Sequence, residues 1–230
     1  MDNTKDPHGP LRRARVAIVG VDDATASLLK PLFEQFKIAA EVLDDKPAER
    51  LRREKFDGCV VRLDPGADDV LKAARTNAAN SRMVVYGVCT GIGDARPYSK
   101  YGINALLMLP LDRREALKAI KGTHLLVLHE FRRYVRIPLA VEVNVTVSGS
   151  PMKATTHEVS GGGMSLQLPV KLRNGDTMEL SLSLPGGPVV KIPAVVRWTK
   201  EAEQLTGVRF EDEDARTKVK NWIDKYLGYM

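Results

Sequence analysis

The chain is expected to fold as two domains of different class, an α/β domain followed by an antiparallel β-barrel. Up to about residue 122, short apolar runs alternate with amphipathic stretches of helical spacing, a pattern typical of a parallel sheet covered by helices on both faces. From about residue 126, polar and apolar residues alternate one by one, as in antiparallel strands with one buried face. A length of 230 residues allows each part to bury its own core.

The α/β part follows a polar segment, residues 1–13, which we expect to be a flexible leader. Apolar runs mark its strands and the spacing of apolar residues marks its helices. Pro47 suits the first turn of one helix, and Asp112 is placed to cap the last one. The expected strands are 16–19, 39–43, 58–63, 83–88 and 105–108. The expected helices are 24–36, 47–55, 68–79 and one that starts near residue 112.

The second part contains clear strands separated by turn signals rich in glycine, proline, asparagine and serine. About six strands are expected, which is enough for a small barrel. The most regular ones are 141–147, 178–184, 189–198 and 206–210. A helix is expected over 213–227, where Val219, Trp222 and Ile223 form an apolar stripe that would cap the barrel.

Composition narrows the possible functions. The net charge of +6 is spread along the chain, with 21 basic and 17 acidic residues up to residue 125 and 14 and 12 after it. This balance permits an anionic ligand without demanding nucleic acid. Cys59 and Cys89 both lie in apolar runs, so we expect buried, reduced thiols.

Catalysis and membrane insertion are not expected. The four histidines and two cysteines form no plausible metal-ligand set, and neither a G-x-S-x-G elbow nor a P-loop is present. No apolar run approaches the roughly 18 residues that a membrane span needs. The polar N-terminus shows no secretory signal, so we expect a cytoplasmic protein. We also expect no cofactor or metal.

Two short motifs carry the functional signal. The first is Arg132-Arg133-Tyr134-Val135-Arg136, and guanidinium groups grip phosphate bidentately and stack on purine rings. The second, Glu158-Val159-Ser160-Gly161-Gly162-Gly163, is a small-residue turn whose backbone and serine hydroxyl can approach a ligand closely.

Together these motifs resemble the two signatures of PilZ domains, R-x-x-x-R and [D/N]-x-S-x-x-G, with Glu158 at the acidic or amide position. The turn at 172–176 and the Gly-Val-x-Phe strand at 207–210 extend the resemblance over the whole second half. It implies a six-stranded barrel with a C-terminal helix that binds the bacterial messenger cyclic di-GMP. The ligand-binding residues it implies are Arg132, Arg133, Arg136, Glu158, Ser160 and Gly163. Because Phe131 replaces a further arginine found in some relatives, we expect one bound ligand.

The first half resembles the receiver domain of two-component signalling, without its phosphorylation chemistry. Gly20 and Val21 follow the first strand where receivers carry acidic residues, and Arg62 ends the third strand where the phospho-acceptor aspartate belongs. Leu109 replaces the lysine before a proline. A slip in the alignment would bring Asp23 or Asp64 into play; the favoured interpretation is a pseudo-receiver kept for contacts, including a possible homodimer. Arg62 would then place a fixed positive charge in the vacant pocket.

The expected organisation is a leader at 1–13, a receiver-like domain at 14–122, a linker or helix with the arginine motif at 123–137, and a PilZ-like barrel with its helix at 138–230. The favoured function is a non-catalytic cyclic di-GMP effector that signals through the inter-domain junction to an unknown downstream protein. One alternative is a degenerate PilZ protein that binds another protein and no nucleotide. The third is a DNA-binding regulator, which is disfavoured because no helix shows a concentrated basic face.

Overall fold

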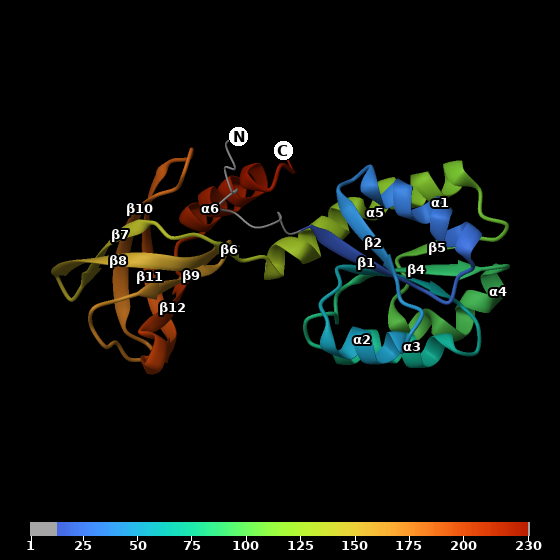
Figure 1. The fold of residues 1–230 in the computed structure, drawn as a ribbon, viewed down its shortest axis with the longest axis horizontal. Coiled ribbons are helices and arrows are strands. Elements are labelled where there is room, and N and C mark those ends of the chain that lie inside the picture. Colours follow the sequence, from blue (N-terminus) through green and yellow to red (C-terminus); the bar gives the residue numbers. More distant parts are fainter. Residues whose placement is uncertain (1–12, 230) are drawn as a thin grey trace, which may run out of the picture. The chain divides into compact units, whose positions relative to one another are not determined.

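The computed structural model describes residues 13–229, which divide into two compact units, 13–134 and 135–229 (Figure 1). The expected leader lies outside the described residues except for Arg13. No helix in the described part of the chain is long and apolar enough to cross a membrane.

The first unit is a five-stranded parallel sheet in the order β2-β1-β3-β4-β5. In Figure 1, α1 and α5 cover one face of this sheet, and α2 and α3 cover the other. Its elements are β1 (Ala14–Val19), α1 (Asp23–Glu34), β2 (Ile38–Val42), α2 (Pro47–Arg53), β3 (Gly58–Arg62), α3 (Ala67–Thr76), β4 (Val84–Cys89), α4 (Ile92–Ala95), a 3₁₀ helix (Arg96–Tyr101), β5 (Ala105–Met108) and α5 (Arg113–Tyr134). The predicted doubly wound α/β fold is therefore confirmed.

Helix α5 is the longest element of this unit and runs without a break through Gly122. A glycine inside a helix costs about 1 kcal/mol relative to alanine, which the buried face of the helix readily offsets. That face includes Ile120 and Val127, both fully buried. The segment expected as a linker or helix is therefore helical as far as Tyr134.

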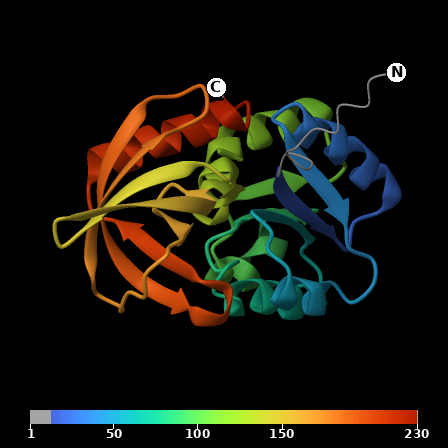
Figure 2. The same ribbon diagram turned by 60° about the vertical axis from the view of Figure 1, so that its left-hand side comes forward.

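The second unit is a closed antiparallel barrel (Figures 1 and 2). Six strands pair in a ring because β8 also pairs with β9, and the short β6 adds to one end of β8. The predicted six-stranded barrel with a C-terminal helix is confirmed. Its elements are β6 (Ile137–Pro138), β7 (Glu142–Val147), β8 (Ser150–Ser160), β9 (Gly163–Gln167), β10 (Thr177–Ser183), β11 (Val189–Lys200), a 3₁₀ turn (Glu201–Glu203), β12 (Leu205–Phe210) and α6 (Glu213–Tyr226).

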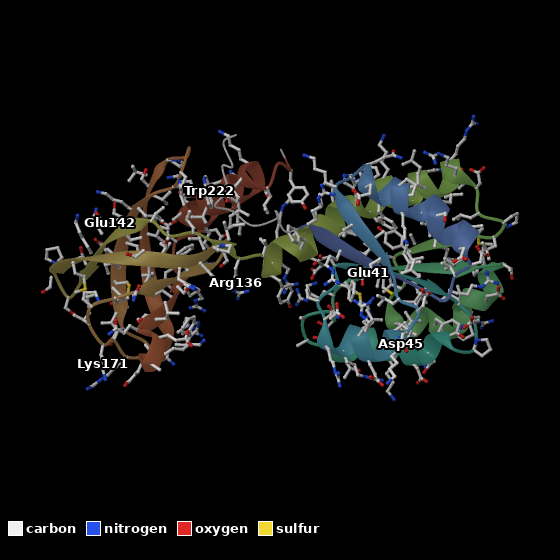
Figure 3. All side chains as sticks on the ribbon, viewed as in Figure 1. Glu41, Asp45, Arg136, Glu142, Lys171 and Trp222 are labelled. Carbon is white, nitrogen blue, oxygen red and sulfur yellow. The ribbon has the colours of Figure 1, made fainter. Side chains whose placement is uncertain are left out.

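Helix α6 begins at a side-chain cap, where Asp212 accepts from the backbone N–H of Ala215 at 2.9 Å. Its apolar stripe packs on the barrel, and Trp222 is only 5% exposed. The indole N–H of Trp222 donates to the carbonyl of Pro185 at 2.9 Å, so the buried ring leaves no orphan donor. Trp222 is thus a core residue, as the sequence indicates (Figure 3).

The two cysteines are both buried and free, as predicted. Burial raises the pKa of the Cys59 thiol to about 12. Such a thiol stays protonated at neutral pH and is a poor nucleophile, so it contributes to packing rather than to chemistry.

A four-residue ion network joins β1, β2 and α2 at the surface of the first unit. Arg15 contacts Glu41 at 2.8 Å and Glu54 at 3.0 Å, while Arg50 contacts the same two carboxylates at 2.7 and 2.6 Å. Hydrogen bonds from Arg50, and to a smaller extent from Arg15, lower the pKa of Glu54 from the ordinary 4.5 to about 2. The stabilisation from Glu54 is therefore complete above pH 4.5 and is lost as the pH falls toward 2.

We predict that Glu54→Gln lowers the free energy of unfolding at pH 7 by about 0.5–1 kcal/mol, the range of partly exposed ion pairs. The difference in unfolding free energy between variant and wild type should shrink as the pH falls below 4.5, because the stabilisation from the ionised Glu54 carboxylate is then being lost. Urea unfolding followed by helical circular dichroism at pH 7 and pH 3 measures both values. A difference that stays the same at the two pH values would contradict the prediction.

Candidate ligand-binding site on the barrel

The second motif folds as the β8–β9 hairpin, in which Ser160 pairs with Gly163 across a two-residue turn. Side chains alternate across a strand, and Val159 points into the core with no exposed surface. Glu158 and Ser160 therefore lie on the outer face of the barrel, where both are half-buried. The hairpin thus presents the polar residues of the motif on one surface.

Gly163 is required because the fold leaves no room for a β-carbon at this position, not because its backbone angles need glycine. A β-carbon on this residue would lie 2.1 Å from the carbonyl oxygen of Val208, a backbone atom of the neighbouring strand. The hydroxyl of Ser160 donates to the carbonyl of Gly163 at 2.9 Å and so holds the turn together. Gly161 faces Lys220 of α6, whereas a β-carbon on Gly162 would meet open space.

Arg136 reaches this face through the pairing of β6 with β8. Ile137 lies opposite Val159, and Pro138 lies opposite Glu158. Continuing this antiparallel register by one residue sets Arg136 opposite Ser160, with its exposed side chain on the outer face (Figure 3). The last arginine of the first motif and the second motif are therefore adjacent in the fold.

These residues line a shallow hollow of about 200 Å³ on the barrel surface. Four of the six predicted site residues contribute to it, and three residues that the sequence reasoning missed join them from β11 and β12. The predicted ones are Arg136, Glu158, Ser160 and Gly163, and the added ones are Arg197, Trp198 and Arg209.

Trp198 forms a flat wall of this hollow. It pairs with Gly207, and a β-carbon on Gly207 would lie 2.0 Å from the indole Cε2, so the ring lies directly on that glycine. The indole is 43% exposed. The pairing of β11 with β12 shifts between Val196 and Trp198, a β-bulge at Arg197 that directs two successive side chains outward.

The hollow combines positive charge with an aromatic surface. Three arginines and one glutamate line it, so it favours an anionic ligand. Arg209 is held in place by Glu211, at 2.9 Å from its Nη2 and 3.0 Å from its Nε. Within the described residues, Arg197 makes no ion pair. Guanidinium groups suit phosphate and an indole face suits a base, so the site fits a nucleotide.

The other two predicted ligand residues, Arg132 and Arg133, lie in the last turn of α5, within the first compact unit. Arg133 contacts the side chain of Glu130 at 3.2 Å, and that carboxylate is 8% exposed. Arg132 is half-buried. The first motif is thus divided between the two units, with only Val135 and Arg136 between α5 and β6.

Sequence reasoning missed Trp198 and Arg209 because their positions depend on features of the fold that the sequence pattern does not show. Strict alternation from the buried Val196 would turn Trp198 inward, and only the bulge brings it to the surface. Arg209 stands more than forty residues from the second motif and reaches it by pairing with Gly163. The sequence signal that could have identified part of this site is the dipeptide Arg197-Trp198 near the end of an expected strand.

In the first unit, the positions at which the sequence resemblance would place phosphorylation residues hold other side chains. Gly20 and Val21 follow β1, and Arg62 ends β3. Asp22 caps α1 by accepting from the backbone N–H of Thr25 at 2.7 Å. Within residues 13–229, no group of three His, Cys, Asp or Glu side chains is arranged to hold a metal ion.

The fold and the hollow define the class of the second unit, a small closed barrel with a basic, tryptophan-walled surface site. Residues 130–227 match the family model of the PilZ domain. This part of the chain is therefore a PilZ domain, from a family that binds cyclic di-GMP, and the five-stranded α/β unit precedes it. No curated protein matches the chain.

Among solved structures, the chain is similar to the PilZ domain of CeSA from a cellulose-synthesising bacterium, at 17% identity and a TM-score of 0.34, over 40% of this chain and 97% of that one. The inhibitor of motility MotI/DgrA of Bacillus subtilis shares 18% identity at a TM-score of 0.35, over 42% of this chain and 51% of that one. The response regulator CheY4 of Vibrio cholerae shares 15% identity at a TM-score of 0.43, over 48% and 98%.

We predict that Gly163→Ala destabilises the barrel by about 1–3 kcal/mol, the cost of forcing an extra carbon into a packed site. The reason is the backbone carbonyl of Val208, which cannot give way as a flexible side chain would. Gly162→Ala is the matched control, since its β-carbon meets nothing within 4 Å. Thermal unfolding followed by tryptophan fluorescence reports on this unit, because both tryptophans lie in it. Equal melting temperatures for the two variants would contradict the prediction.

Proposed function

We propose that this protein is a bacterial, non-catalytic effector that binds cyclic di-GMP in the hollow on the PilZ barrel. The observation that carries the proposal is the convergence of Arg136, Glu158 and Trp198 from three distant segments on one surface hollow. Cyclic di-GMP is a dianion with two guanines, so it offers phosphates to the arginines and flat bases to the indole.

Each lining residue has a defined role in this proposal. Arg136 and Arg209 contact phosphate, and Trp198 stacks on one guanine. Glu158 accepts from the N1–H and N2–H groups of that guanine. Arg132 and Arg133 close over the ligand from the end of α5, as the family motif implies. No metal or other cofactor takes part.

Ligand capture is coupled to the receiver-like unit through the first motif. Arg132 and Arg133 belong to α5, which packs on the parallel sheet, whereas Arg136 adjoins the barrel. A ligand held by both sets fixes the end of α5 relative to the barrel. We propose that this ordering is the signal, read in the cytoplasm by a protein that binds the receiver-like unit, which also supplies a homodimer contact.

The second candidate function, a PilZ module that binds a protein and no nucleotide, is favoured by one feature. Glu158 is one methylene longer than the aspartate of the family motif, and Pro138 lies directly opposite it. A carboxylate displaced by about 1.5 Å can lose its hydrogen bonds to guanine, each worth roughly 1.5–3 kcal/mol when charge-assisted.

We predict that calorimetric titration of cyclic di-GMP into the full chain gives micromolar or tighter binding with one ligand per chain. The double variant Arg132→Ala/Arg136→Ala should bind at least a hundredfold more weakly, because two charge-assisted contacts are lost. Arg52→Ala/Arg53→Ala is the matched control, since it removes the same charge from exposed positions on α2.

Four outcomes bear on this prediction. Silence up to about a millimolar would favour the protein-binding alternative. Two ligands per chain would overturn the stoichiometry. Under the nucleotide-binding proposal, Glu158→Asp should bind cyclic di-GMP more tightly than the wild type. Under the alternative, neither the wild-type chain nor Glu158→Asp should bind it. Salt-sensitive retention of the chain on DNA would instead support a DNA-binding regulator.

A second prediction concerns the stacking wall. In the variant Trp222→Phe, Trp198 is the single tryptophan, and cyclic di-GMP should change its emission as a guanine stacks on the indole. Trp198→Ala should weaken binding by about tenfold or more, because stacking is worth roughly 1–3 kcal/mol per base. Unchanged emission together with unchanged affinity of Trp198→Ala would exclude Trp198 from the ligand.

A further inference from the structure

Ser165 of β9 carries a buried hydroxyl that has no hydrogen-bond partner. The residue is 6% exposed. Two other side chains in the described residues have a buried oxygen without a hydrogen bond, Asp57 and Glu130, and each lies beside a cation, Lys55 or Arg133. Leaving a buried hydroxyl unpaired costs free energy, so a hydrogen-bond partner from outside the chain would stabilise it.

The position of Ser165 supplies that explanation. Its neighbours Met164 and Leu166 are buried apolar residues of β9, so Ser165 belongs to the opposite, outer row. It pairs directly with Glu158 of β8 on one side and with Gly207 of β12 on the other. It also lines the hollow with Arg136 and Trp198. The unpaired hydroxyl is therefore part of the floor of the proposed binding site.

The spacing of Ser165 and Glu158 matches the edge of one base. Side chains of directly paired residues have β-carbons about 4.5–5.5 Å apart, so both reach the same small group. The Watson–Crick edge of guanine presents O6 as an acceptor beside N1–H and N2–H as donors. Glu158 can accept from both donors but has nothing to donate to O6. A hydroxyl next to it can donate.

We propose that Ser165 is a further ligand-contacting residue, its hydroxyl donating to the O6 of the guanine whose N1–H and N2–H are accepted by Glu158. This inference rests on the proposed function. Adenine presents an acceptor at N1 where guanine has a donor, so it opposes the carboxylate of Glu158, whereas its amino group can donate to a hydroxyl. Glu158 therefore selects guanine, and Ser165 adds a hydrogen bond to the selected base.

Access to the hydroxyl requires movement of the side chains that border it. These are Glu158 and, across Gly207, the indole of Trp198. The indole is 43% exposed, and Glu158 is half-buried. The guanine reaches Ser165 as these two side chains turn outward and enclose the base, with the indole forming the stack.

The test is calorimetric titration of cyclic di-GMP into the full-length Ser165→Ala variant, with its melting temperature measured in parallel. We expect affinity about tenfold weaker than wild type, the loss of one hydrogen bond, and a melting temperature equal to or above that of wild type. Ser181→Ala is the matched control, since Ser181 is a half-buried serine on the outer face of β10 that lines a different hollow. It should bind as wild type does.

Competition with cyclic di-AMP completes the test. Wild-type protein and Ser165→Ala should both prefer cyclic di-GMP to cyclic di-AMP, because adenine N1 opposes the carboxylate of Glu158 in each. Wild-type affinity in Ser165→Ala would overturn the inference while leaving the proposed function intact. Weaker binding together with a lower melting temperature would overturn it too, by showing a structural role. If wild-type protein does not bind cyclic di-GMP, the proposed function itself fails and this inference with it.

Discussion

The pairing of β8 with β9 is the interaction on which the barrel and its site both depend. This ladder closes the ring of six strands, so the barrel has no open edge between its first and last members. The same ladder carries Glu158, Ser160, Gly163 and Ser165. Because the closing strands are also the site-bearing strands, the geometry of the hollow is fixed by backbone hydrogen bonds rather than by a mobile loop.

Glycine at two positions makes this arrangement possible, and in each case the reason is close packing. Gly163 lets β9 approach the backbone of β12, and Gly207 lets the indole of Trp198 lie flat on the sheet. Neither has a positive φ. Gly163 of the family motif therefore leaves room for the backbone of β12, and Gly207 leaves room for the indole of Trp198.

The fold was predictable from the sequence because each half carries a consistent pattern. Apolar runs and helical spacing define the parallel sheet, and strict alternation defines the barrel strands. Glu158, Ser160 and Gly163 could be proposed from the sequence because they lie in one short motif. Trp198 could not be, because a bulge overrides the alternation that assigns it to the core. Ser165 could not be, because only the structure shows that its hydroxyl has no partner.

Under the proposed function, the carboxylate partners of the proposed ligand-binding arginines account for selectivity. Arg209 is already paired with Glu211, and Arg133 with the nearly buried Glu130. A phosphate that recruits either arginine must displace a carboxylate, so the net gain is smaller than for a free guanidinium. A loosely held anion therefore gains little here. In the proposed binding mode, a ligand that engages several arginines and also stacks on Trp198 gains both kinds of contact in exchange for these pairs. Under this proposal, simultaneous engagement of phosphate and base, rather than net charge, is the condition for binding.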